Sequence, residues 1–252
     1  MLIDTHCHIN FPDKFPDPAG TIEEAKMAGV ERLIAVGCDP ETSRAAVALA
    51  ERYAEVFAVV GWHPTYTKDY TRKSLDEIEQ MLGHPKVVAL GEIGLDFHWD
   101  FSTPEEQMAA LTDQLDLANR VDIPVVFHCR EAYPELLDIL ESRQPHPYLL
   151  HCFAGTASDA QRALKLGAMF GVDGPITYKN ANDLRAVISQ IPKDRLVIET
   201  DSPYMPPVPH RGQPNKPAYV PYVNAALASV LGIAEEQCAE LTSTNAMQFF
   251  RI

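Results

Sequence analysis

Two histidines separated by a single residue, His6 and His8, follow the first apolar run of the chain, Leu2–Asp4. In an extended segment, side chains two residues apart project to the same side, so both imidazoles can reach one ion. Imidazole nitrogen is a common ligand of zinc and of other transition metals. The pair therefore predicts a metal site at the end of this run.

Ionisable residues also end four later apolar runs. They are Glu92, His128, His151 and Asp201. Each alone also fits a structural role: Asp201 before Ser-Pro fits a helix N-cap, and Glu92 between glycines fits a turn. The occurrence of an ionisable residue at the end of each of these runs favours one shared metal centre.

Four histidines and two carboxylates are more ligands than one tetrahedral ion needs. They suit two divalent ions, with Glu92 as the natural bridge because a carboxylate can give one oxygen to each ion. Such a pair of ions holds a substrate oxygen and activates water, which is hydrolase chemistry. The mixed donors admit Mg²⁺, Mn²⁺ or Zn²⁺.

Three cysteines, Cys7, Cys129 and Cys152, directly follow histidines of this set. They should point the opposite way along each strand, so we interpret them as packing residues rather than ligands. The five cysteines of the chain show no repeated spacing. This pattern is typical of reduced thiols in a cytosolic protein.

The elements that position these residues alternate along the chain. Short runs that are apolar on both faces, as in a buried parallel sheet, precede stretches with helical spacing. We expect strands at Leu2–Asp4, Arg32–Gly37, Val56–Gly61, Val87–Gly91, Pro124–Phe127, Tyr148–Leu150, Met169–Val172 and Leu196–Ile198. We expect helices at Thr21–Ala28, Glu41–Tyr53, Lys73–Leu82, Pro104–Arg120, Ala132–Ser142, Ser158–Leu166, Asn182–Gln190, Val220–Leu231 and Glu235–Phe249.

This alternation predicts a (β/α)₈ barrel, in which all strand ends meet at the rim that carries active sites. An open doubly wound sheet is the alternative, although no Gly-x-Gly-x-x-Gly follows the first strand. We find no internal repeat and no low-complexity linker, so we expect residues 1–252 to form one domain.

The composition is that of a globular protein, with 46% hydrophobic and 22% charged residues in 252. A net charge of −14 argues against a broad nucleic-acid-coating surface but leaves room for a local cationic pocket. No apolar run approaches the roughly 20 residues of a membrane helix, and no signal peptide is visible. We therefore expect a cytoplasmic protein with no membrane contact. No coiled-coil heptad suggests an obligate protein partner.

The motifs around these residues resemble those of the TatD family of metal-dependent deoxyribonucleases. The matching segments are Asp4-Thr5-His6-Cys7-His8, Gly91-Glu92-Ile93-Gly94-Leu95-Asp96, His128-Cys129-Arg130, His151-Cys152-Phe153 and Glu199-Thr200-Asp201-Ser202-Pro203, with further matches at Gly61-Trp62-His63-Pro64, His210-Arg211-Gly212 and Asn215-Lys216-Pro217. The resemblance extends from the first strand to Asn245-Ala246. It departs at Asn10, where an aspartate is common, and at Cys129-Arg130-Glu131, which varies a more frequent Ser-Arg-Asp.

The resemblance implies a TIM barrel of the amidohydrolase superfamily that binds two divalent ions and hydrolyses DNA, often as a 3′-to-5′ exonuclease on single strands. It assigns to one ion His6, His8, Glu92 and Asp201, and to the other Glu92, His128 and His151. Asp201 and Glu92 are then the catalytic residues, with Asp201 as a proton acceptor for the attacking water. His63 is placed near the site by its motif, as a substrate contact or as a ligand of an additional weak metal site.

The sequence indicates the residues that contact substrate less closely than it indicates the metal ligands. Arg130, Lys179 and Arg211 lie in loops after strand ends, where they can bind phosphate or remain solvated rim charges. Aromatic residues in the same loops can stack on the bases of a single strand or pack the mouth of the barrel. They are Trp62, Phe97, Trp99, Tyr178 and Tyr204.

Two other functions remain open at this point. The same barrel and ions would serve a hydrolase of a carboxylic ester, a lactone or an amide, but a neutral substrate does not need three cationic loop residues. A non-catalytic metal-binding scaffold would bind ions without turnover.

Overall fold

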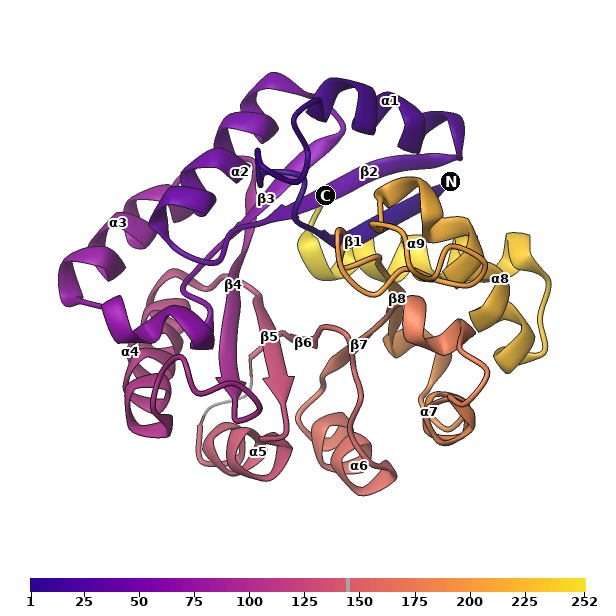
Figure 1. Cartoon of the computed structure of the whole chain (residues 1–252). Helices are drawn as coiled ribbons and strands as arrows, with labels where there is room; N and C mark the ends of the chain where they lie inside the picture. The colour runs from indigo at the N-terminus through magenta and orange to yellow at the C-terminus, as the bar shows by residue number, and fades with distance from the viewer. Residues whose placement is uncertain (144–145) are drawn as a thin grey trace.

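Eight parallel strands pair in sequence order and form a barrel that is surrounded by helices (Figure 1). The computed structural model describes residues 1–143 and 146–252. The strands are β1 (Leu2–Cys7), β2 (Val30–Val36), β3 (Val56–Val60), β4 (Val87–Asp96), β5 (Val125–Arg130), β6 (Tyr148–Leu150), β7 (Met169–Val172) and β8 (Leu196–Ile198). The predicted fold class is confirmed.

Each strand is followed by a helix on the outside of the barrel. The α-helices are α1 (Pro18–Met27), α2 (Pro40–Arg52), α3 (Arg72–Leu82), α4 (Pro104–Val121), α5 (Tyr133–Glu141), α6 (Ala157–Lys165), α7 (Asn182–Ile188), α8 (Val220–Leu231) and α9 (Glu235–Phe250), and the 3-10 helices are η1 (Pro64–Asp69), η2 (Gly174–Thr177), η3 (Lys193–Arg195) and η4 (Pro217–Tyr219). Asp39 caps the N-terminus of α2 and Thr103 that of α4, each directly before a proline in the first turn.

Two apolar clusters occupy the two faces of the sheet. On β2, Leu33 and Ala35 belong to the cluster shared with the helices, whereas Ile34 and Val36 belong to a smaller cluster inside the barrel. Phe250 of α9 joins the inner cluster. Because alternate residues of a strand enter different clusters, the strand sequences are apolar throughout.

Backbone pairing and side-chain hydrogen bonds join the first strand to the residues that follow the last strand. Cys7 and Ser202 form an isolated parallel bridge, and the amide of Asp201 donates to the carbonyl of His6 at 2.9 Å. The buried Asp4 carboxylate accepts from the amide of Thr200 at 2.9 Å and from its hydroxyl at 2.6 Å. These bonds hold the end of β1 against the residues that follow β8.

Three strands continue farther than the sequence predicts, which corrects the expected ends. β1 extends to Cys7, β5 to Arg130, and β4 to Asp96, so that Glu92 lies within β4 rather than after it. The apolar pattern breaks where the strand leaves the packed interior and enters the polar mouth, although strand pairing continues. At Gly94, φ is +144° and a Cβ atom would collide with the carbonyl oxygen of His128, so this close approach of β4 and β5 requires glycine.

Within the described ranges, no single helix has the length and apolar character needed to cross a membrane. The segments Pro217–Leu231 and Glu235–Phe250 pass this test as a pair, and they are bent by 104°.

We expect Thr200→Val to lower the free energy of unfolding by about 1–3 kcal/mol, because it leaves a buried oxygen of Asp4 without its hydroxyl donor. Denaturant unfolding followed by circular dichroism measures the loss. Thr21→Val is the control, since the Thr21 hydroxyl bonds only within the first turn of α1 and should change stability by about 0.5 kcal/mol or less. Equal losses in the two variants would contradict this role of Thr200.

Candidate metal centre

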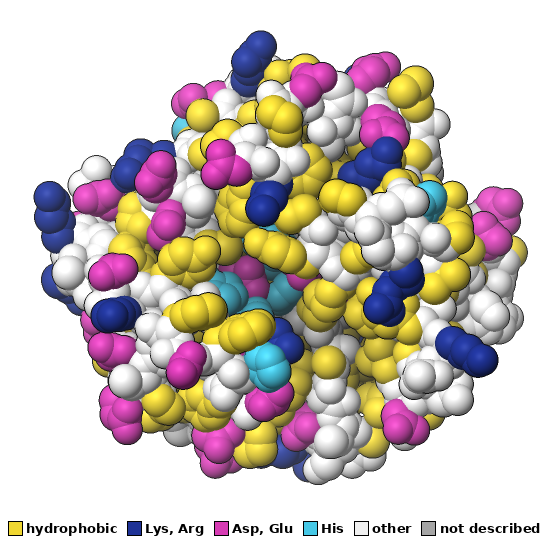
Figure 2. All heavy atoms as spheres, viewed as in Figure 1, with side chains coloured by type: hydrophobic (Ala, Val, Ile, Leu, Met, Phe, Trp, Pro, Cys, Tyr) yellow, Lys and Arg dark blue, Asp and Glu magenta, His cyan; other side chains and the backbone are white. Residues whose placement is uncertain are grey.

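The six predicted ligands meet at one end of the barrel. Their side chains come from β1, β4 and β5 and from the residues after β1, β6 and β8. His6, His8, Glu92, His151 and Asp201 are buried, and His128 is partly buried. Figure 2 shows histidine and acidic side chains at the bottom of a hollow that hydrophobic side chains surround.

Glu92 is at the centre of this group, and its two carboxylate oxygens face different histidines. Oε2 lies 3.3 Å from Nε2 of His6 and 3.9 Å from Nε2 of His8. Oε1 lies 2.8 Å from both Nδ1 of His128 and Nε2 of His151. One carboxylate therefore separates two sets of imidazoles.

Asp201 completes the first set. Its Oδ1 lies 3.4 Å from Nε2 of His8 and 3.8 Å from Nε2 of His6. The backbone of Asp201 is in the left-handed region at φ +54°, as is that of Cys152 at φ +45°, directly after His151. Such a conformation costs energy in non-glycine residues and is concentrated at functional sites.

The histidines control the charge of the central carboxylate. Burial acts to raise the pKa of Glu92, but His151, His63 and His6 together hold that pKa well below its ordinary value. Burial lowers the pKa of His6. For His151, the effect of burial is outweighed by Glu92 and Glu199, which raise its pKa well above the ordinary value. Glu92 is therefore ionised in a buried site.

The donor set fits divalent cations. Both ring nitrogens of His6 are buried and form no hydrogen bond with the part of the chain that the structure describes. Three groups have ligand atoms that all lie within 4.8 Å of one another, namely His6 with His8 and Glu92, His63 with Glu92 and His128, and His6 with His151 and Glu199. Nitrogen and carboxylate oxygen at these separations are the donors that Zn²⁺ and Mn²⁺ accept.

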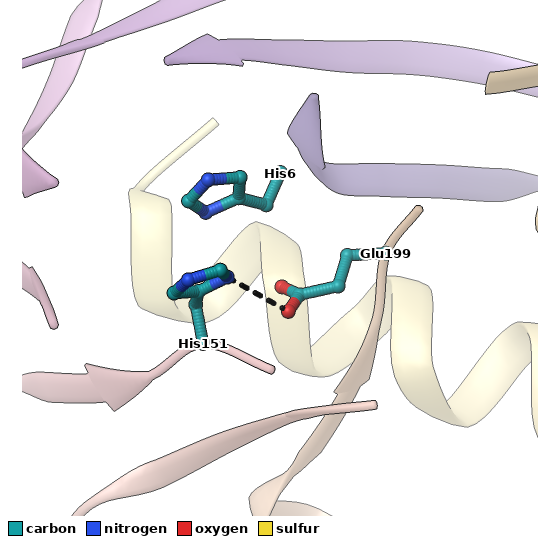
Figure 3. A group of neighbouring side chains, drawn as sticks. All are labelled: His6, His151 and Glu199. Atoms are coloured by element: carbon teal, nitrogen blue, oxygen red, sulfur yellow. Dashed lines mark ion pairs between the residues drawn. The ribbon is translucent and has the colours of Figure 1, made fainter. Parts of the chain in front are cut away.

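Glu199 is a residue of the site to which sequence reasoning gave no role. Its Oε1 forms an ion pair with Nδ1 of His151 at 3.3 Å, and the ring of His151 stacks on that of His6 with centroids 3.9 Å apart (Figure 3). The amide of Cys152 donates to the same oxygen at 2.6 Å, and the hydroxyl of Thr5 donates to Oε2 at 3.2 Å. Glu199 thus orients His151 so that Nε2 faces Glu92.

Asp96 has the corresponding position beside His128. Its Oδ2 lies 2.8 Å from Nε2 of His128, whose Nδ1 faces Glu92. The signal for both missed residues was their spacing. Asp96 lies four residues after Glu92, and Glu199 lies two residues before Asp201, spacings that in a fully extended segment would place each pair on one face.

A further buried carboxyl group, that of Asp173, lies near these residues. Asp173 directly follows β7, is buried, and its Oδ2 forms no hydrogen bond with the described residues. Burial, with Glu199 and Asp201 nearby, raises its pKa well above the ordinary value. Sequence reasoning passed over this strand end.

The cysteines beside the histidines are all unpaired thiols. Cys7 and Cys129 are buried, and the Cys7 thiol donates to the carbonyl of Ile34 at 3.4 Å. Cys152 is partly exposed, with its sulfur 4.0 Å from that of Met205. Burial raises the pKa of all three thiols.

The predicted substrate contacts are distributed over the rim. His63 is drawn into the centre, with Nε2 3.5 Å from Oε1 of Glu92. The ring of Tyr204 lies edge-on to His8 with centroids 6.0 Å apart. Arg130 and Arg211 are exposed and lie over the rings of Trp99 and Tyr178, at 5.6 and 4.0 Å. Lys179 is exposed between η2 and α7.

Comparison with known proteins identifies close relatives. The model of the family "TatD related DNase" matches residues 3–251. The uncharacterized metal-dependent hydrolase YabD of Bacillus subtilis is 39% identical over 254 residues, covering 100% of both chains. The 3′-5′ ssDNA/RNA exonuclease TatD of Pectobacterium atrosepticum is 33% identical, covering 94% of each.

A solved structure has the same architecture. The crystal structure of YjjV, a TatD homologue from Escherichia coli K12, superposes with a TM-score of 0.94 at 35% identity. The match covers 100% of this chain and 98% of that one.

We expect Glu199→Gln to weaken binding of Zn²⁺ or Mn²⁺ by about 10- to 100-fold, because it removes the charge that orients His151. Titration against a chromophoric chelator measures the affinity without a substrate. Glu236→Gln, an exposed position on α9, should bind the ion like the wild type. A folded Glu199→Gln protein with wild-type metal affinity would be incompatible with the positioning role.

Proposed function

The chain belongs to the TatD-related DNase family, and from this premise we propose that it is a metal-dependent exonuclease that removes nucleotides from the 3′ end of single-stranded DNA. The arrangement of Glu92 between two sets of histidines carries the proposal, because it suits a pair of ions on one phosphodiester. Relatives named as 3′-5′ ssDNA/RNA exonucleases support the polarity and the substrate, and they extend the substrate to RNA.

Two divalent ions are proposed at this centre, with Glu92 between them. His6, His8, Glu92 and Asp201 would hold one ion, and Glu92, His128 and His151 would hold the other. His63 stands as close to Oε1 as a further ligand would. When bound, the ions supply positive charge for the phosphate oxygens and lower the pKa of a water molecule.

Asp201 is proposed to accept the proton of the attacking water. Burial acts to raise the pKa of Asp201, but the nearby His8, His151 and His6 hold it below its ordinary value, so the carboxylate is ionised and able to take a proton. The water oxygen forms a new bond to phosphorus and the bond between phosphorus and the departing sugar oxygen breaks. The proton that Asp201 accepted passes to that sugar oxygen, which leaves as a hydroxyl group. Glu199 and Asp96 keep His151 and His128 oriented throughout.

The rim is proposed to bind the rest of the strand. The protein carries a net charge of −14, so an approaching polyanion is repelled except where ions or exposed arginines face it. Arg130 and Arg211 are such arginines, and Lys179 and Tyr204 lie in neighbouring loops. A cytoplasmic location, a single domain and the absence of an obligate protein partner complete the proposal.

The relatives favour this function over the two alternatives that the sequence left open. The family and the named activities of its members are those of an enzyme, which argues against the hypothesis of a non-catalytic metal-binding scaffold. None of the matched relatives described above is named for an ester, lactone or amide substrate.

We expect Glu92→Ala to reduce cleavage of single-stranded DNA by about 10³-fold or more, because both ions lose their shared ligand. A 5′-end-labelled oligonucleotide incubated with Mg²⁺, Mn²⁺ or Zn²⁺ should give a ladder that shortens from the 3′ end. Glu236→Ala, at an exposed position on α9, should cleave at the wild-type rate. No cleavage by the wild type with any of the ions, in protein shown to bind them, would reject the nuclease.

Removal of the ions should abolish binding of DNA and not only its cleavage, since the acidic protein has few other attractions for a polyanion. Fluorescence anisotropy of a labelled oligonucleotide should show at least about a tenfold weaker complex after chelation and dialysis. Restored Mn²⁺ should recover it. Tight binding by the metal-free protein would place the affinity elsewhere on the surface.

A further inference from the structure

The loop from residue 97 to residue 103, between β4 and α4, presents two large aromatic rings to solvent. Trp99 is 46% exposed and Phe101 is 59% exposed. Their rings stack on each other, with centroids 5.6 Å apart and planes inclined by 16°. Exposed, adjacent apolar rings of this size mark surfaces that bind a partner or a ligand.

The position of this loop is fixed relative to the metal centre. Oδ1 of Asp96 accepts hydrogen bonds from the amides of His98 at 3.0 Å and Trp99 at 3.1 Å. Oδ2 of the same carboxylate faces Nε2 of His128 at 2.8 Å. Gln107 of α4 donates to the carbonyls of Asp96 and Ser102, at 2.8 and 3.1 Å, and so closes the loop from the other side. The side chain of Asp96 therefore connects the backbone of Trp99 to His128, a proposed metal ligand.

A cation without a carboxylate partner covers one of the rings. The guanidinium of Arg130 lies 5.6 Å from the centroid of the Trp99 ring. Among the described residues, no acidic side chain pairs with Arg130, whereas Arg44, Arg143 and Arg162 all form ion pairs with acids. In a protein with 35 acidic and 21 basic residues, an unpaired arginine beside the centre is available to an anion.

We propose that Trp99 and Phe101 form a stacking platform for a base of the single-stranded substrate, and that Arg130 binds the phosphate beside that base. This inference rests on the proposed nuclease function and adds to it a binding subsite outside the metal centre. Every base has a flat face, so the platform accepts any sequence. Bases that are already paired and stacked in a duplex do not offer that face, so the platform also favours single strands.

The platform can be observed directly because the chain has only two tryptophans. Trp62 is buried, with 7% exposure, so a base that stacks at the rim should change the emission of Trp99. The probe is a phosphorothioate oligothymidylate, which resists cleavage, added to the metal-loaded protein. An abasic strand of the same length keeps the phosphates and lacks the bases. Quenching by the first and not by the second is the expected result.

Steady-state kinetics test how much the two rings contribute to binding of single-stranded DNA. We expect Trp99→Ala and the double variant Trp99→Ala/Phe101→Ala to raise KM for single-stranded DNA by about 5- to 150-fold, which corresponds to the loss of one stacked base. Trp99→Phe keeps a ring and should recover most of the affinity. Cleavage of bis(p-nitrophenyl) phosphate, too small to reach the platform, should be unchanged in all three variants.

A matched pair of arginines controls for charge. Arg52 at the end of α2 lies over Tyr53 at 5.3 Å, as Arg130 lies over Trp99, but it precedes β3 at the opposite end of the barrel. Arg130→Ala should raise KM for the oligonucleotide several-fold, and Arg52→Ala should not.

The outcomes separate this inference from the proposed function. Wild-type cleavage of single strands with an unchanged KM in the double variant would overturn the platform and leave the nuclease. Quenching of Trp99 without cleavage by the wild type would keep the strand-binding site and reject the nuclease. Neither quenching nor cleavage would reject both. Equal losses in Trp99→Phe and Trp99→Ala would also overturn the platform, because a stacking role tolerates the phenyl ring.

Discussion

The structure depends on one buried negative charge, the carboxylate of Glu92. An ionised group in a protein interior is costly unless opposite charge and hydrogen-bonding partners surround it. Here the partners are imidazoles, and they come from several strands that are far apart in sequence. The barrel brings all its strand ends to one rim, and this topology gathers the imidazoles around the carboxylate.

A second layer of carboxylates repeats this arrangement around the histidines. His128 is placed between Glu92 and Asp96, and His151 between Glu92 and Glu199. Each imidazole is thereby fixed in orientation, and its other nitrogen becomes a more basic metal ligand. The Glu199 carboxylate packs directly against the backbone of β7. A Cβ atom at Gly171 would lie 2.5 Å from Oε1 of Glu199, so this position of β7 requires glycine. The surplus of negative charge at the mouth is what a pair of cations would neutralise.

The sequence allowed the barrel and the inner set of residues to be predicted, because both depend on local patterns. Apolar runs identified each strand, and ionisable residues at their ends identified the rim. The ends of β1, β4 and β5 were misplaced because a strand can continue after its apolar pattern stops. That error concealed Asp96, which belongs to the same strand as Glu92. The spacing of Glu199 from Asp201 was a local signal for its place in the site, but its contact with His151, 48 residues earlier in the chain, is one that no local pattern reports.

The bonds that join β1 to the residues after β8 have a consequence for the synthesis of the protein. His6 and His8 are synthesised first, but Asp201 follows about 195 residues later, roughly 10 to 40 s at ordinary translation rates. Until then neither the barrel nor the full ligand set can close. A chain that stops before residue 199 carries five of the histidines of the mouth and lacks both late carboxylates. A copy that stops there is therefore unable to assemble the full ligand set.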